Sequence, residues 1–108
     1  MKVIQDKKYY TITEVAAMLN VNASKIRFWE TEFDILKPKK NKKGDRFFDE
    51  VNIENLQLIY YLLKIRRFTI EGAKKKIKDD IKGIREEQAM RESLLKMKSF
   101  LEELEEAL

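Results

Sequence analysis

Residues 13–32 read TEVAAMLNVNASKIRFWETE, and their pattern predicts two short helices in succession. The apolar residues between Val15 and Leu19 recur at the spacing of one helical face. That spacing predicts a short helix, which we expect to be N-capped by Thr13. Asn20 follows as a C-cap, because asparagine tolerates the left-handed backbone conformation better than most residues.

A second helix is expected directly afterwards, capped by Asn22 or Ser24 and running to about Glu32. Two short helices joined by a turn of three or four residues form a helix-turn-helix pattern. One side of the second helix is apolar and is expected to face the core. Its residues are Ile26, Trp29 and Phe33.

The other side of this helix carries Ser24, Lys25 and Arg27, together with Phe28. A helix with these outward residues can sit in the major groove of DNA, where Lys or Arg reaches guanine edges and Ser reaches bases or phosphates. A solvated helix face above a core tryptophan is the alternative, and the helix alone does not decide between them.

Residues 36–49, LKPKKNKKGDRFFD, contain the only proline and show no apolar helical period. We interpret them as an extended loop or a two-stranded hairpin, with residues 41–45 at the tip and Phe47 and Phe48 in the returning strand. So many like charges repel one another unless an anion such as a DNA backbone is present. A solubilising basic loop is the alternative, but the aromatic anchor favours a DNA-binding wing. The cations are Lys37, Lys39, Lys40, Lys42, Lys43 and Arg46.

Two further helices are expected, one over residues 51–68 capped by Asn52 and one beginning at Thr69. The lysine run at residues 74–78 favours a solvated helix face over a phosphate contact. From about Ile84 the apolar residues follow a 4-3-4-3-4 spacing, which is the a/d pattern of a coiled coil. Such a helix could fold back on its own domain, but its charged rim favours a helix–helix interface. The seam residues are Met90, Leu94, Met97, Leu101, Leu104 and Leu108.

Charge is divided unevenly along the 108 residues. Residues 1–82 hold 19 Lys and Arg against 12 Asp and Glu, whereas residues 83–108 hold 4 against 7. This division indicates a polyanion-binding head joined to a tail with another role. The chain has no Cys and no His, which argues against thiol chemistry and the common zinc sites. Without an apolar leader or a long apolar run, we expect a cytoplasmic protein.

The order of these motifs over residues 9–80 resembles the MerR-type transcriptional regulators. The matching positions are Ile12 to Ala16, Asn20-Val21, Ile26 to Glu30, Pro38 through Arg46 with Phe48, and Asn52. The resemblance implies a dimer with its recognition helix in the major groove, its wing on the DNA backbone or minor groove, and an antiparallel coiled coil between C-terminal helices. It also implies that Arg27, Phe28 and Arg46 lie against phosphates.

The sequence departs from the family pattern at several positions. Phe28 replaces the usual tyrosine and offers no phenolic hydrogen bond, while Asn20 and Arg67 stand where glycine is typical. Metal-sensing members use cysteines, which this chain lacks, and the chain ends where a drug-binding domain would start. The resemblance therefore gives no support to small-molecule sensing.

These observations predict a mainly α-helical winged helix-turn-helix domain over residues 1–82 and a dimerisation helix over residues 83–108. We expect a homodimer on a palindromic operator in double-stranded DNA, with RNA polymerase at the promoter as a further partner, and no enzymatic activity, cofactor, metal or membrane contact. The predicted DNA-binding residues are Thr13, Asn22, Ser24, Lys25, Arg27, Phe28, Lys39, Lys40, Lys42, Lys43 and Arg46. An excisionase-like architectural protein and a protein-binding adaptor with an incidental basic face remain alternatives.

Overall fold

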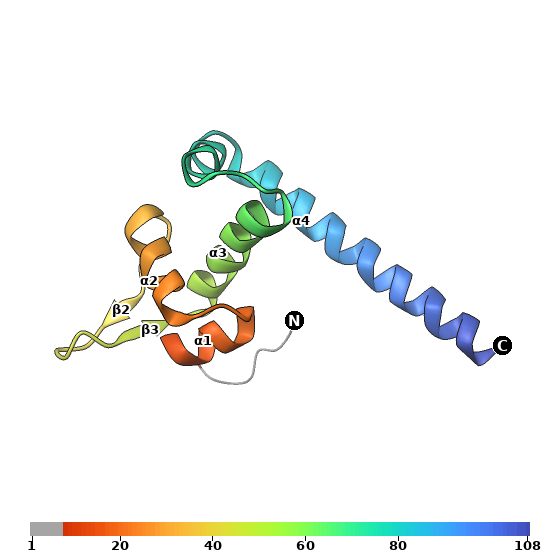
Figure 1. Ribbon diagram of the computed structural model, residues 1–108, viewed down its shortest axis with the longest axis horizontal. Helices are drawn as coiled ribbons and strands as arrows, with labels where there is room; N and C mark the ends of the chain where they lie inside the picture. The colour runs from red at the N-terminus through yellow and green to blue at the C-terminus, as the bar shows by residue number, and fades with distance from the viewer. Residues whose placement is uncertain (1–7) are drawn as a thin grey trace. The chain divides into compact units, whose positions relative to one another are not determined.

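The computed structural model of the protein describes residues 8–108. Residue contacts divide the chain into two compact units, one ending at Lys74 and the other spanning Lys75–Leu108. The first unit contains α1, α2, α3 and a small sheet, and the second contains most of the long helix α4 (Figure 1). The predicted mainly helical fold with a short wing is confirmed.

Helix α1 (Ile12–Leu19) begins one residue before Thr13, its predicted cap. The Thr11 hydroxyl accepts a hydrogen bond from the Glu14 amide at 3.2 Å, and the Glu14 carboxylate accepts one from the Thr11 amide at 2.9 Å. Because this reciprocal capping box satisfies two amides together, Thr11 is the cap and the prediction of Thr13 was wrong. Asn20 is left-handed, with φ of 57°, which confirms the predicted C-cap.

Helix α2 (Ala23–Glu32) follows after a short turn. The Asn22 side chain accepts a hydrogen bond from the Lys25 amide at 3.1 Å, so Asn22 is the cap among the two candidates. The hydroxyl of Ser24 donates to the same side-chain oxygen at 3.0 Å. Ile26 and Trp29 are buried, which confirms the predicted core face of the helix.

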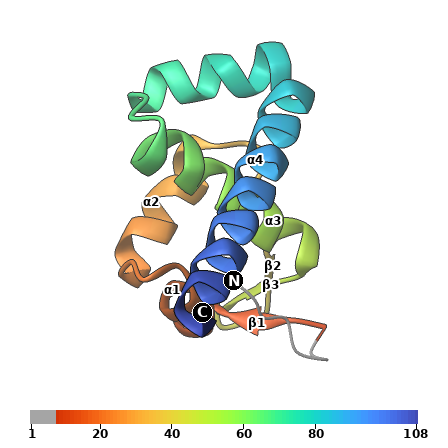
Figure 2. The ribbon, with the colours of Figure 1, turned by 90° about the vertical axis from the view of Figure 1, so that its right-hand side faces the viewer.

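The wing is an antiparallel hairpin of β2 (Lys39–Lys40) and β3 (Arg46–Phe48), as predicted. A third strand, β1 (Tyr10–Thr11), pairs with the other edge of β3, with Tyr10 opposite Phe48 (Figure 2). Both aromatic side chains are buried. Sequence analysis missed β1 because two residues are too few to show a strand alternation.

The tip of the wing is a tight turn fixed by Asn41 and Gly44. The Gly44 amide donates to the Asn41 carbonyl at 3.0 Å, and the Asn41 amide donates to the Asp45 carbonyl at 3.2 Å. Gly44 has φ of +86°, a conformation that costs glycine least. The Asn41 side-chain oxygen also accepts from the amides of Lys43 and Asp45, so the tip is ordered by its own backbone.

Helix α3 (Glu50–Tyr60) is capped by Asp49, whose carboxylate accepts from the Asn52 amide at 2.9 Å. The predicted cap at Asn52 was wrong, because the Asn52 side chain forms hydrogen bonds with the backbone of Lys37. Its side-chain oxygen accepts from the Lys37 amide at 2.9 Å and its amide group donates to the Lys37 carbonyl at 3.3 Å. These bonds attach the segment that precedes the wing to the first turn of α3.

A π-helical turn (Tyr61–Ile65) extends α3, and Arg67 then adopts a left-handed φ of 61°. This left-handed conformation is the one that glycine adopts most easily, which agrees with the expectation that Arg67 stands where glycine is typical. The Thr69 hydroxyl accepts from the Gly72 amide at 3.0 Å, which confirms the predicted start of α4 (Ile70–Ala107).

Helix α4 is interrupted at Asp80, whose backbone is not helical. The Asp80 carboxylate accepts from the Gly83 amide at 3.0 Å and thereby caps the part of the helix that follows. A Cβ atom on Gly83 would lie 2.2 Å from an Asp80 carboxylate oxygen, so this cap requires glycine. The predicted separation of a 69–80 helix from the tail thus has its physical cause at Asp80.

Candidate nucleic-acid interface

Helix α2 presents a cation and an aromatic ring to solvent. Arg27 is exposed and Phe28 is 49% exposed, whereas Trp29, the next residue, is almost completely buried. No ion pair involves Arg27 in the described part of the chain. An unpaired guanidinium beside an exposed ring is a surface that can receive a phosphate and the sugar next to it.

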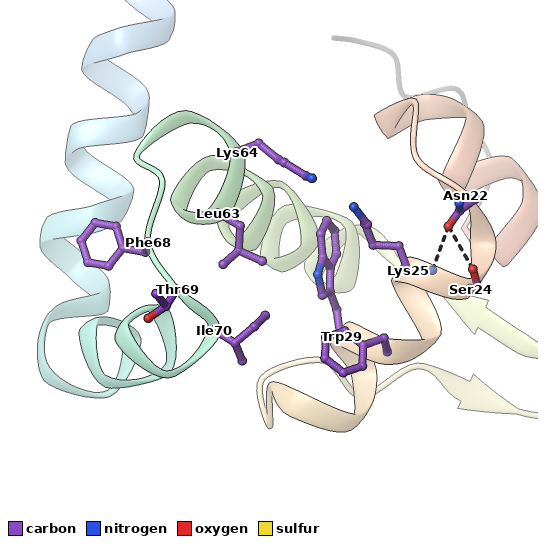
Figure 3. A pocket seen from close by; sticks show the side chains of 10 residues that line it. Asn22, Ser24, Lys25, Trp29, Leu63, Lys64, Phe68, Thr69 and Ile70 are labelled. Atoms are coloured by element: carbon purple, nitrogen blue, oxygen red, sulfur yellow. Dashed lines mark hydrogen bonds between the residues drawn. The ribbon is translucent and has the colours of Figure 1, made fainter.

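An open hollow of about 560 Å³ lies beside the N-terminal turn of α2 (Figure 3). One wall of the hollow is lined by Asn22 and by three of the predicted DNA-binding side chains of α2. The opposite wall is formed by the π-helical turn and the start of α4. The lining residues are Asn22, Ser24, Lys25, Phe28, Trp29, Leu63, Lys64, Phe68, Thr69 and Ile70.

Lys25 and Lys64 point their ammonium groups toward one another in this hollow (Figure 3). The pKa of Lys25 is lowered, first by its side-chain contact with Lys64 and then by the charge of that neighbour. No carboxylate is paired with either lysine among residues 8–108. Lys64 is therefore a candidate anion contact that sequence analysis missed, since its position depends on the π-helical turn.

Thr13 and Asn22 are uncharged predicted DNA contacts that precede α2 in the chain. Thr13 is exposed in the first turn of α1, and Asn22 is exposed before α2. The Asn22 side-chain oxygen already accepts hydrogen bonds within the protein, which leaves its amide group as the part that could donate to DNA. Their DNA-binding roles stay predictions.

The wing presents four exposed lysines in two different settings. Lys42 and Lys43 lie at the tip, where the turn projects them into solvent. Lys39 lies over the Tyr9 ring at 5.4 Å, and a side-chain hydrogen bond with Tyr9 raises the pKa of Lys39. Lys40 is 3.5 Å from the Glu30 carboxylate of α2. The tip lysines are therefore the ones best placed to meet an external anion.

Arg46 differs from the other predicted phosphate contacts because it is half-buried and ion-paired. Its Nε donates to the Glu30 carboxylate, which also holds Lys40. Sequence analysis did not anticipate this three-residue cluster, which joins positions 16 residues apart. The predicted contact of Arg46 with phosphate stays a prediction.

The tail of α4 exposes an apolar stripe. The predicted seam residues up to Leu104 are between 47% and 62% exposed, and Leu108 is fully exposed. Their spacing places them on one face of the helix. The ion pair between Lys98 and Glu102, 3.6 Å apart, lies beside this face. Their spacing is the a/d pattern of a coiled coil, and their role in dimerisation stays a prediction.

Within residues 8–108, no group of three His, Cys, Asp or Glu side chains is placed to hold a metal ion. No helix in that part of the chain is long and apolar enough to cross a membrane.

Comparison with curated proteins gives matches to regulators. The chain is 34% identical over 50 residues to the HTH-type transcriptional regulator MlrA of Escherichia coli (strain K12), covering 46% of this chain and 21% of that protein. It is 39% identical over 67 residues to the regulator protein TubY of Clostridium botulinum C phage, covering 62% of this chain and 28% of that protein. The chain thus spans between a fifth and a third of the length of these relatives.

Solved structures show the same fold. HiNmlR, described as a MerR family regulator lacking the sensor domain and bound to promoter DNA, superposes with a TM-score of 0.57 at 18% identity, covering 90% of this chain and 85% of that one. A MerR family transcriptional regulator from Bacillus thuringiensis gives 0.51 at 25% identity, covering 93% and 90%. Residues 10–80, more than half of the chain, match the profile described as MerR HTH family regulatory protein. The chain therefore belongs to the MerR family of helix-turn-helix regulatory proteins.

Proposed function

We propose that this MerR-family transcriptional regulator binds a palindromic operator in double-stranded DNA as a homodimer. The observation that carries the proposal is the solvent-exposed Arg27 and Phe28 face of α2, flanked by the basic tip of the wing. A recognition helix and a cationic wing are the elements that such proteins place in the groove and on the backbone. The further DNA contacts that we propose are Thr13, Asn22, Ser24, Lys25, Lys39, Lys42 and Lys43.

The homodimer is supported by the apolar stripe on the tail. A regular a/d seam that is about half-exposed from Met90 to Leu104 is suited to a second copy of the same helix. We assign DNA binding to residues 1–82 and dimerisation to residues 83–108. A two-fold axis between two heads would impose matching symmetry on the operator, because each head reads one half-site.

The structural neighbour HiNmlR is described as bound to promoter DNA. By analogy, we propose that the operator of this chain lies in a promoter and that RNA polymerase is a further partner there. We also propose that the protein acts in the cytoplasm. Family membership supports transcriptional regulation and gives no indication of an enzymatic reaction.

The proposal is tested by selecting bound duplexes from a random DNA library at near-physiological salt and sequencing them. A two-fold symmetric motif with a fixed spacer is the expected result, and it supplies the operator. A single unpaired half-site would contradict the dimer on a palindrome. The absence of any motif would favour an architectural protein, or an adaptor with an incidental basic face.

A further inference from the structure

The base of the wing contains a pair of like charges that its own strands cannot stabilise. Lys40 of β2 lies directly opposite Arg46 of β3 in the antiparallel register. Two cations at directly opposed positions destabilise a strand pair. An anion between them reverses the sign of this effect.

Glu30 of α2 supplies that anion. One carboxylate oxygen lies 3.5 Å from the Lys40 ammonium group, and the other accepts from Nε of Arg46. The Glu30 side chain is only 14% exposed, so this pairing is less screened than a surface salt bridge. A single side chain of the recognition helix therefore holds both strands of the wing.

The wing needs such a fastening because its strands are very short. β2 has two residues and β3 has three, and β2 is an edge strand that pairs with β3 alone, so few backbone hydrogen bonds hold it. Arg27 lies three residues before Glu30 on the same helix, so the carboxylate sits one turn from the proposed phosphate contact. Fixing the wing to α2 fixes the spacing between two DNA-contacting elements.

We propose that Glu30 is a positioning residue that determines DNA specificity by locking the wing to the recognition helix. This inference rests on the proposed DNA-binding function. In the locked state the single Glu30 carboxylate offsets one of the two positive charges of Lys40 and Arg46, and Nε of Arg46 is committed to that carboxylate, so Arg46 positions the wing and does not contact phosphate. Only cations without an internal partner release counterions from DNA, and these set the salt dependence of binding.

The test compares four proteins on two fluorescent duplexes, one of random sequence and one carrying the motif selected above. The wild type, Glu30→Gln, Arg46→Gln and the control Glu32→Gln are titrated between 50 and 200 mM salt. Glu32 is on the same helix and pairs with Lys74 at 3.5 Å, away from the wing. The control therefore changes net charge equally without releasing the wing.

Glu30→Gln is expected to bind the random duplex more tightly, with a salt slope steeper by about one to two. The preference for the selected duplex should fall by roughly tenfold, because a loose wing no longer favours one geometry. Arg46→Gln should lower the preference without reducing the salt slope on the random duplex. Glu32→Gln should keep the preference of the wild type.

A slope reduced by about 0.9 in Arg46→Gln would overturn the proposal, because that is the signature of a lost phosphate contact. A proportional loss of binding to both duplexes in Glu30→Gln would also overturn it, since that indicates a structural role alone. If circular dichroism shows that Glu30→Gln is unfolded, Arg46→Gln decides the question. Failure of the proposed function itself looks different, because the wild type would then bind neither duplex in a salt-dependent way.

Discussion

Replacing Leu101 with lysine should break the proposed dimer while leaving the DNA-binding head folded. The Leu101 side chain is 56% exposed in the single chain, in the middle of the apolar stripe. Fully burying a leucine contributes about 1.5–3 kcal/mol, so covering its exposed half contributes roughly 1–1.5 kcal/mol per helix. A two-fold interface contains the residue twice, which gives about 2–3 kcal/mol per dimer.

This free energy corresponds to a dimer dissociation constant roughly 30 to 150 times higher. The new lysine charge, moved into the seam, adds to that loss. Sedimentation equilibrium over a series of concentrations measures the constant directly, and light scattering gives the mass. We expect the wild type at twice the chain mass and Leu101→Lys at the chain mass at the same concentration.

Leu95→Lys is the matched control for this experiment. Leu95 is also an exposed leucine, at 46%, on the same helix. It lies about 120° around the helix from Leu101, outside the seam. We expect this variant to dimerise like the wild type. An unchanged mass for Leu101→Lys, or equal dissociation of the two variants, would refute the coiled-coil reasoning.

Three further changes test the head. Arg27→Ala should weaken binding to all duplexes and reduce the salt slope by about 0.9, and an effect confined to one base position would show a base contact instead. Asn52→Ala removes three side-chain hydrogen bonds, two of them to the Lys37 backbone, and should lower the free energy of unfolding by roughly 2–4 kcal/mol in urea titrations. Gly44→Ala should cost about 1–2 kcal/mol through the backbone alone, since no atom lies within 4 Å of the added Cβ. Gly44→Asn should recover part of this loss, because asparagine tolerates the left-handed region.

Helical periodicity predicted most of the fold, but it did not locate the helix caps. The apolar spacing identified α1, α2 and the buried Trp29. The caps at Thr11 and Asp49 were misplaced by two and three residues toward the C-terminus. A cap is decided by which side chain reaches an unpaired amide, and several polar residues compete for that position in the sequence. Only backbone geometry distinguishes them.

The candidate site shows a similar division between local and distant features. The outward set on α2 follows from spacing on one helix, so Arg27 and Phe28 could be placed on the surface from sequence alone. The contacts of Glu30 with the wing and of Lys25 with Lys64 join residues far apart in the chain. Charge patterning could not reveal that Arg46 already has a partner, because a count of cations ignores internal pairing.

The head and the tail contribute to affinity in ways that binding data can separate. Joining two heads makes the second binding event intramolecular, with an effective concentration in the millimolar range for a short link. A head variant such as Arg27→Ala lowers the affinity of each head for its half-site by some factor. The affinity for a paired site then falls by the square of this factor, and the affinity for a single half-site falls by the factor itself. Leu101→Lys removes the link but leaves each head unchanged, so binding to a single half-site should match the wild type. A dimer variant that altered half-site preference would therefore show that the tail also shapes the head.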